Sequence, residues 1–244
     1  MSKVFSLPIA IVCYAAFFLS FTYLIGFVAG LDVLPAHVDK GLSAPPFVAA
    51  AIDVSLIALF GLQHSVMARP RFKESWTRLV PPPIERSVYC LATALCLVAL
   101  FVFWHPIAGM VWSVENEVAR IAIWGVFLLG WTILFVATWL INHFELFGLH
   151  QAWRHARGQS APQQTFRTPF LYKWVRHPIY TGFLLAFWAT PDMSLGHLLF
   201  SIGMTIYIFI GIAHEERDLL AHFGQQYADY RSRVGAVIPG VGRR

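Results

Sequence analysis

Residues 176–182 read Arg176-His177-Pro178-Ile179-Tyr180-Thr181-Gly182, a basic pair followed by a proline and the start of an apolar run. Proline is favoured at the first position of a helix, so a helix is predicted to begin at Pro178. Its first turn would present unpaired backbone N–H groups beside Arg176, and this arrangement is typical of an anion-binding site. The stretch therefore predicts both the start of a membrane helix and one side of a ligand site.

The composition of the whole chain is that of an integral membrane protein. Of its 244 residues, 57% are hydrophobic and only 13% are charged, whereas soluble domains carry about 25% charged residues. The formal charge of +5 suits basic loops at a membrane surface, and we expect no nucleic-acid partner. The cysteines lie in apolar runs without metal-like spacing, so no disulfide framework is expected from Cys13, Cys90 and Cys96.

Six apolar spans are predicted, and the expected fold class is all-α, a polytopic membrane helix bundle. The first four spans have about 20 residues or more, enough to cross a bilayer as helices. The fifth has only about 13, and a Pro-Asp-Met-Ser turn joins it to the sixth, which predicts a tight C-terminal helical hairpin. The spans are expected at about residues 4–31, 47–67, 85–104, 119–140, 178–190 and 195–213.

Lysine and arginine are distributed unevenly between the connections. If the N-terminus is cytoplasmic, every basic residue except Lys40 and Arg120 falls on the cytoplasmic side. Membrane proteins retain positive charge on that side, so both termini are predicted to be cytoplasmic. The chain shows no internal repeat, and residues 1–244 are expected to form a single integral-membrane domain.

In this topology four span ends bring polar side chains to the cytoplasmic face. Ionisable groups at membrane depth are costly and are often functional. The alternative is that polar residues cap the spans at headgroup level, but the opposite ends lack a comparable set. The predicted cluster contains Gln63, His64, Asn142, His143, Glu145, Arg176, His177, His214, Glu215 and Glu216.

Several members keep alternative interpretations. Arg176 could pair with lipid phosphate, and Gly182 could serve either close ligand approach or plain helix packing. Glu215 and Glu216 point about 100° apart on a helix, so one can face a ligand while the other pairs with Arg217 or solvent. Beyond them, an apolar stripe that includes Tyr227 and Tyr230 predicts an amphipathic segment on the membrane, interrupted at Gly224.

The histidines suggest two further kinds of site, a haem site and a metal site. A haem would be held between histidines inside facing spans, whereas these histidines lie at span ends. His143, Glu145 and His150 are close in sequence, but their spacing matches no strong metal-ligand pattern, so no metal is expected.

The motif at 176–182, the pair Glu215-Glu216 and the pattern Phe223-Gly224-x-x-Tyr227-x-x-Tyr230 together resemble the isoprenylcysteine carboxyl methyltransferase superfamily. Residues 63–69 and 142–149 look most like the nurim-type branch and, within it, the bacterial methanethiol S-methyltransferases. The resemblance covers nearly the whole chain.

This resemblance implies an S-adenosylmethionine-dependent thiol S-methyltransferase that converts methanethiol to dimethyl sulfide. It implies an enzyme of the bacterial inner membrane whose active site faces the cytoplasm. Its partners would be the small thiol and the lipid bilayer, with no obligate protein partner. Methylation of a lipid-like or isoprenylated carboxylate is an alternative, as is a non-enzymatic nurim-like membrane protein.

The resemblance suggests the cofactor residues, whereas the base is a hypothesis based on the shared location of the polar residues at the span ends. The base is expected to be His64 or His143, with Glu145 orienting one of them and Gln63 or Asn142 placing the substrate. The rings of Tyr180 and Tyr207 could face the sulfonium and adenine. The cofactor is expected within about residues 172–235, at Arg176, His177, Tyr180, Gly182, Tyr207, Glu215 and Glu216.

Overall fold

The structure, a computed structural model, describes residues 3–160 and 165–243. In that part of the chain nearly all regular structure is helical. The helices are α1 (Lys3–Val28), α2 (Pro46–Met67), α3 (Pro70–Trp76), α4 (Pro82–Phe103), α5 (Glu117–Leu140), α6 (His143–Leu146), α7 (Leu149–Arg157), α8 (Pro178–Trp188), α9 (Leu195–Phe223) and α10 (Gln225–Arg233), with a 3₁₀ turn at Phe170–Lys173.

Among the described residues, five helices are long and apolar enough to cross a membrane, namely α1, α2, α4, α5 and α9. The fifth predicted span, α8, is a shorter apolar helix. These elements confirm an all-α polytopic membrane bundle with a short fifth span. The largest boundary error concerns α9, which continues to Phe223 instead of ending near Ala213. The cytoplasmic location of both termini stays a prediction.

Proline explains where several of these helices begin. Pro46, Pro82 and Pro178 are each the first residue of a helix. Because the first backbone N–H groups of a helix have no partner within it, a residue without an N–H costs nothing there. The start of α8 at Pro178 was therefore predictable from the sequence.

The connections contain structure that the sequence pattern did not indicate. Strands β1 (Met110–Ser113) and β2 (Asp192–Ser194) pair in a two-stranded sheet, where only a turn had been expected. Arg120 at the start of α5 forms an ion pair with Asp192 of β2, with 2.6 Å between Nη2 and Oδ2. The expected basic loops also contain three short helices, α3, α6 and α7. The strand pairing and the Arg120–Asp192 ion pair join segments far apart in sequence, so no local pattern predicts them.

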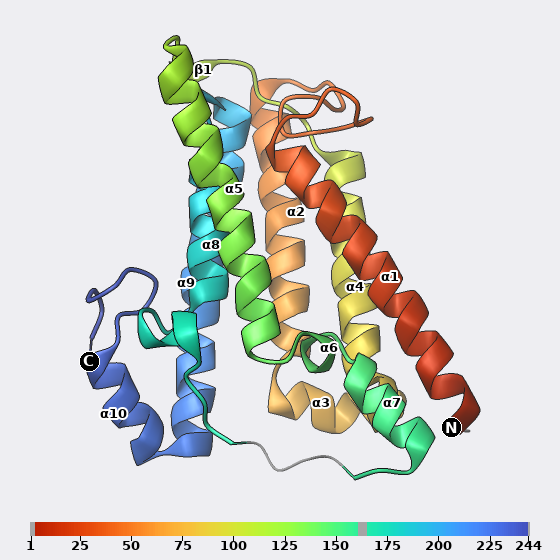
Figure 1. Cartoon of the computed structure of the whole chain (residues 1–244). Helices are drawn as coiled ribbons and strands as arrows, with labels where there is room; N and C mark the ends of the chain where they lie inside the picture. The colour runs from red at the N-terminus through yellow and green to blue at the C-terminus, as the bar shows by residue number, and fades with distance from the viewer. Residues whose placement is uncertain (1–2, 161–164, 244) are drawn as a thin grey trace. The chain divides into compact units, whose positions relative to one another are not determined.

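The chain divides into two compact units. The first contains Met1–Gly109, Asn142–Pro162 and Ser194–Phe200. In it, α1 and α2 each pack against α4, and α7 packs against α1 (Figure 1). Its core includes the buried rings of Phe27 and Trp104, which meet edge to face with centroids 5.6 Å apart.

The second unit contains Met110–Ile141, Gln163–Met193 and Ser201–Arg244. In it, α5 lies along α8 (Figure 1). A side chain on Gly130 of α5 would come within 2.7 Å of the Gly182 carbonyl oxygen, and one on Gly182 within 2.5 Å of the Gly130 carbonyl oxygen. Of the two interpretations of Gly182, the structure therefore favours helix packing over ligand approach. The prediction of a single domain stays a prediction.

Candidate functional site

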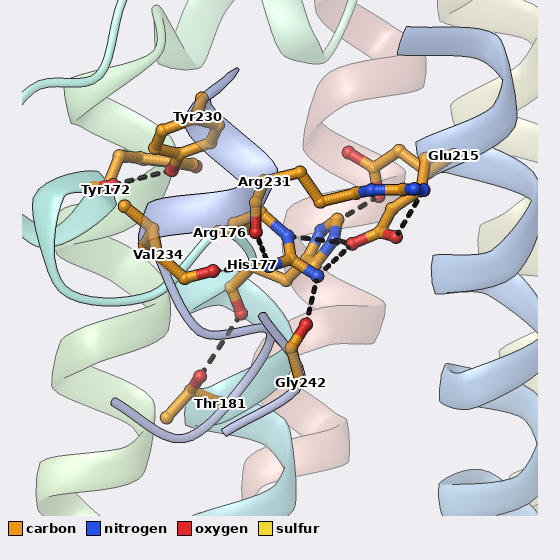
Figure 2. A network of polar contacts seen from close by, with 10 residues as sticks. Tyr172, Arg176, His177, Thr181, Glu215, Tyr230, Arg231, Val234 and Gly242 are labelled. Carbon is orange, nitrogen blue, oxygen red and sulfur yellow. Dashed lines mark hydrogen bonds and ion pairs between the residues drawn. The ribbon is translucent and has the colours of Figure 1, made fainter. Parts of the chain in front are cut away.

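The second unit contains a buried group of charged side chains, called here the charged cluster: Arg176, His177, Glu215, Glu216 and Arg231. Arg176 and His177 directly precede α8, the two glutamates lie on α9, and Arg231 lies on α10 (Figure 2). Arg176, His177 and Glu216 are 5%, 4% and 8% exposed. Charges so deeply buried must compensate one another, because each lost most of its hydration on folding.

The guanidinium of Arg176 uses all its N–H donors within the protein. Nε donates to Glu216 Oε1 at 2.8 Å, and Nη2 lies 2.6 Å from the same oxygen. Nη1 donates to the carbonyls of Arg231 and Val234, and Nη2 also donates to that of Gly242. An arginine has five such donors. We had expected Arg176 to face a ligand carboxylate; in the structure its donors are taken by Glu216 and by the C-terminal residues.

Residues 234–242 lie across the start of α8, and sequence reasoning missed them. The backbone N–H groups of Arg176 and His177 donate to the carbonyls of Gly235 and Ala236. The hydroxyl of Thr181 donates to the Val237 carbonyl at 2.8 Å; it also lies 3.2 Å from the His177 carbonyl oxygen (Figure 2). A side chain on Gly235 would come within 2.2 Å of a backbone oxygen. A glycine close to the C-terminus was thus the one available signal, and it is a weak one.

Both glutamates contact His177. Glu216 Oε1 lies 3.2 Å from Nε2, and Glu215 Oε2 lies 3.6 Å from Nδ1. Burial alone would lower the pKa of His177, but its bonds to Glu215 and Glu216 outweigh burial and raise that pKa. Glu216 pairs with Arg176 and His177, and of the two alternatives expected for the other glutamate, Arg217 or solvent, the exposure of Glu215 fits solvent. The side chain of Glu215 is 46% exposed, so one of its oxygens can serve a ligand.

Aromatic rings surround the charged cluster. The ring of Tyr180 lies 5.7 Å from that of His177. A methyl group on Gly211 of α9 would lie 3.5 Å from Tyr180 Oη. Tyr207 is one turn before Gly211 and therefore on the same side of α9. The structure thus places Tyr180 and Tyr207 near one stretch of α8 and α9, although their assignment to a cofactor stays a prediction.

Tyr227 and Tyr230 are buried within the second unit, so the predicted apolar stripe does not present them to the membrane. Both rings contact Phe166, and Tyr230 Oη donates to the Tyr172 carbonyl at 2.5 Å. Burial raises the pKa of Tyr230 to about 12. Within the described residues, Tyr227 Oη and Arg231 Nε are buried without a hydrogen-bond partner. Two such polar atoms beside the charged cluster are suited to a polar ligand.

The first unit contains the other predicted site residues, among them His64 and His143. Nδ1 of His64 lies 3.2 Å from Thr93 Oγ1, and Nε2 of His143 lies 2.8 Å from Tyr14 Oη. Burial lowers the pKa of His143, so this ring is neutral at pH 7. The sequence analysis missed Thr93 and Tyr14, because a single hydroxyl within an apolar span forms no motif.

Asn142 and Glu145 form a local cap. Asn142 has a left-handed backbone (φ 88°) and precedes α6. Its amide donates to Glu145 Oε2 at 2.8 Å, and Arg154 binds Glu145 Oε1 at 2.9 Å. The carboxylate of Glu145 contacts Asn142 and Arg154, while hydroxyl groups contact the two histidines; its role in orienting a histidine stays a prediction.

Gln63 differs from these residues in having an unused acceptor. Its amide nitrogen donates to Met67 Sδ at 3.2 Å, while Oε1 is buried without a partner within the described residues. Gln63 therefore stays a candidate for placing a small hydrogen-bonding substrate.

Among the described residues, no group of three or more His, Cys, Asp or Glu is arranged to hold a metal.

Comparison with known proteins identifies close relatives. The chain is 50% identical over 229 residues to methanethiol S-methyltransferase 1 of Bradyrhizobium diazoefficiens, covering 94% of this chain and 80% of that protein. It is 47% identical over 226 residues to the methanethiol S-methyltransferase of Mycobacterium tuberculosis, covering 93% and 92%. Human nurim is 30% identical over 196 residues, covering 76% and 72%. No family model and no solved structure matches the chain.

Proposed function

The chain belongs to the methanethiol S-methyltransferase family, within the nurim-like branch, and on that premise we propose that it methylates methanethiol with S-adenosylmethionine. The methyl carbon leaves the sulfonium sulfur and bonds to the thiolate sulfur, giving S-adenosylhomocysteine and dimethyl sulfide. The thiol proton passes to a base of the protein. High identity to such relatives over nearly the entire chain is the observation that carries this proposal.

The residues around the charged cluster fit this cofactor. S-adenosylmethionine supplies a methyl group on a cationic sulfur and also bears an ammonium group and ribose hydroxyls. The half-exposed carboxylate of Glu215 can accept from an ammonium or a hydroxyl. Tyr180 and Tyr207 offer π faces that attract a cation. The unpartnered Tyr227 Oη and Arg231 Nε add polar atoms for the same ligand.

The remaining residues of this group have a different role in the proposal. Arg176, His177 and Glu216 satisfy one another and the C-terminal segment. We assign them to holding the start of α8 in place, with Gly182 packing α8 on α5. They contribute to cofactor affinity through the position of Glu215 and Tyr180.

Thiol activation is assigned to the histidines of the first unit. A free alkyl thiol is mostly protonated at neutral pH, since even cysteine has a pKa near 8.5. The thiolate is the nucleophile, so a neutral imidazole is suited to accept the proton. His64 and His143 are the candidates, and Gln63 and Asn142 carry amides able to place the substrate. An apolar thiol can reach these span ends from the bilayer.

We place the enzyme in the bacterial inner membrane with this chemistry at the cytoplasmic face. The distribution of lysine and arginine supports that orientation. A phosphatase that is active only outside the cytoplasm, fused to the C-terminus, should be inactive. An active fusion would reverse the topology.

The direct test is an assay of the purified protein in detergent with methyl-labelled S-adenosylmethionine and methanethiol. Labelled dimethyl sulfide should appear in the headspace. Glu215→Gln should raise the KM for the cofactor about tenfold, the effect of losing roughly one charged hydrogen bond. Arg217→Gln is the matched control, because Arg217 is an exposed charge two residues along the same helix.

Three outcomes would contradict parts of the proposal. No product despite cofactor binding would redirect the substrate search to prenylated carboxylates. No cofactor binding at all would leave a non-enzymatic membrane protein, as the similarity to nurim allows. Product formation with an unchanged KM in Glu215→Gln would remove Glu215 from the cofactor site.

A further inference from the structure

Thr93 occupies a defined place beside His64. Its hydroxyl donates to the Tyr89 carbonyl, one helical turn earlier on α4, at 3.0 Å. The same oxygen lies 3.2 Å from Nδ1 of His64 on α2. Thr93 is 2% exposed, so water does not replace these partners.

A hydroxyl group has one proton to donate and two lone pairs that accept. Because Thr93 donates its proton to the Tyr89 carbonyl, its oxygen can only accept from His64. Nδ1 of His64 must therefore carry a hydrogen, and in a neutral imidazole the lone pair then lies on Nε2. We infer that Thr93 is a positioning residue that holds His64 in this tautomer, and that Nε2 of His64 is the atom that takes the proton from the thiol.

The ring of His64 is also held in orientation. Phe60, one turn earlier on α2, stacks on it with centroids 5.6 Å apart, and the ring of Tyr89 lies 4.9 Å away. Tyr89 Oη donates to the His64 carbonyl at 3.3 Å. A base whose tautomer and ring plane are both set needs little reorganisation when it accepts a proton.

The geometry distinguishes His64 from His143. The partner of His143 is Tyr14 Oη, 2.8 Å from Nε2. A phenol can donate or accept, and among the described residues no hydrogen bond commits the Tyr14 proton elsewhere as the Tyr89 carbonyl commits that of Thr93. The contact at His143 is therefore compatible with either tautomer, whereas the contact at His64 selects one.

The inference rests on the proposed function and specifies its proton transfer. The S–H bond of the thiol breaks and an N–H bond forms at Nε2, leaving a thiolate and an imidazolium. Nδ1–H keeps its bond to Thr93, and a hydrogen bond that accepts from the imidazolium stabilises the cation. After methyl transfer, Nε2 returns the proton to solvent and the neutral tautomer is restored.

Kinetics of Thr93 variants test the inference first. Thr93→Val removes the acceptor at nearly constant volume and should lower kcat about tenfold or more, the usual cost of misplacing a general base. The KM for the cofactor should not change, and the acidic limb of the kcat profile should move. Thr93→Ser should recover kcat to within about threefold of the wild type. Thr22→Val is the matched control, because Thr22 makes the same backbone bond one turn back on α1.

A double-mutant comparison separates positioning from a structural role. Thr93→Val should cause almost no further loss of kcat in a His64→Gln background, because its effect acts through His64. In a His143→Gln background it should still lower the residual kcat about tenfold. Equal losses in both backgrounds would overturn the inference, because a purely structural role of Thr93 predicts that result.

A spectroscopic measurement does not depend on activity. In protein labelled with ¹⁵N-histidine, signals missing from His64→Gln identify His64. Nδ1 should show the shift of a protonated nitrogen and Nε2 that of an unprotonated one, and Thr93→Val should disturb this pattern. A proton on Nε2 of the wild type would overturn the inference even if dimethyl sulfide forms. Absence of dimethyl sulfide together with the expected spectrum would instead refute the proposed function and, with it, the role of His64 as a base.

Discussion

The charged cluster of the second unit and the histidines of the first unit are built on opposite principles. In the charged cluster, cations and carboxylates are buried together, and Arg176 alone bonds to Glu216 and to three C-terminal carbonyls. In the first unit, His64 and His143 each contact a neutral hydroxyl. One region holds fixed charges that balance, while the other holds imidazoles that are able to change charge.

This difference indicates what each region can do. A buried ion-pair network resists change, because removal of one partner leaves the other buried without compensation. It is suited to holding a backbone in place. A neutral imidazole that contacts a hydroxyl can exchange a proton without breaking an ion pair, so it is suited to acid–base chemistry. Substitutions should therefore affect stability mainly in the second unit and turnover mainly in the first.

Arg176 should give the largest loss of stability. Arg176→Met leaves Glu216 without its main cation and releases the C-terminal segment, so the unfolding free energy should fall by about 3–5 kcal/mol. Arg176→Lys should recover little of this stability, because an ammonium group cannot reproduce the planar, multiple-donor geometry of the guanidinium. Unfolding in mixed detergent measures both, with exposed Arg233→Met as the control. If Arg176→Met were as stable as the control, the charged cluster would have no structural role.

The packing of α5 on α8 should give an intermediate effect. A side chain on Gly130 would meet backbone of α8 at 2.7 and 2.8 Å, whereas one on Gly125 of the same helix would meet nothing within 4 Å. Gly130→Ala should lower stability by about 1–3 kcal/mol through overpacking, and Gly125→Ala should raise it by up to about 1 kcal/mol through helix propensity. The same detergent titration compares the two. Equal effects would show that close contact does not position α8.

His177 and His143 should give the smallest effects on stability and opposite dependences on pH. The pKa of His177 is raised, so its stabilisation is complete below about pH 6.5, the ordinary value, and is lost as pH rises through the folded value. The pKa of His143 is lowered, so the unfolded chain binds more protons and stability falls as pH drops below about 6.5.

Melting temperatures between pH 5 and 9 for wild type, His177→Gln and His143→Gln measure this contrast. Relative to wild type, His177→Gln should lose the decline on the alkaline side, and His143→Gln should lose the decline on the acidic side. Parallel curves for all three proteins would contradict the contrast between the two regions. The comparison also needs no knowledge of the substrate.

Much of the fold was predictable from local sequence. Length and hydropathy located the spans, and the observed helices α1, α2, α4 and α5 begin or end within a few residues of the expected positions. Pro178 marked the start of α8 because proline suits that position and little else in a helix. The motifs likewise indicated a family that the curated relatives confirm.

The site was only partly predictable. Motifs named His64, His143, Arg176 and Glu216, but not what each one contacts. Arg176 was expected to bind a ligand, and it binds the C-terminal backbone instead. Such partners lie tens of residues away, and one hydroxyl in an apolar run is indistinguishable in sequence from one that faces lipid.

By itself, the sequence determined that this chain is a helical membrane protein with a polar set of side chains at its span ends. Those features follow from hydropathy, helix length and proline stereochemistry, which act over a few neighbouring residues. Only the tertiary structure decided that Thr93 contacts His64, that Glu145 contacts Asn142 and Arg154, and that residues 234–242 cover the start of α8. Hydrogen bonds and ion pairs need atoms within about 3 Å, and only the folded chain brings distant segments that close.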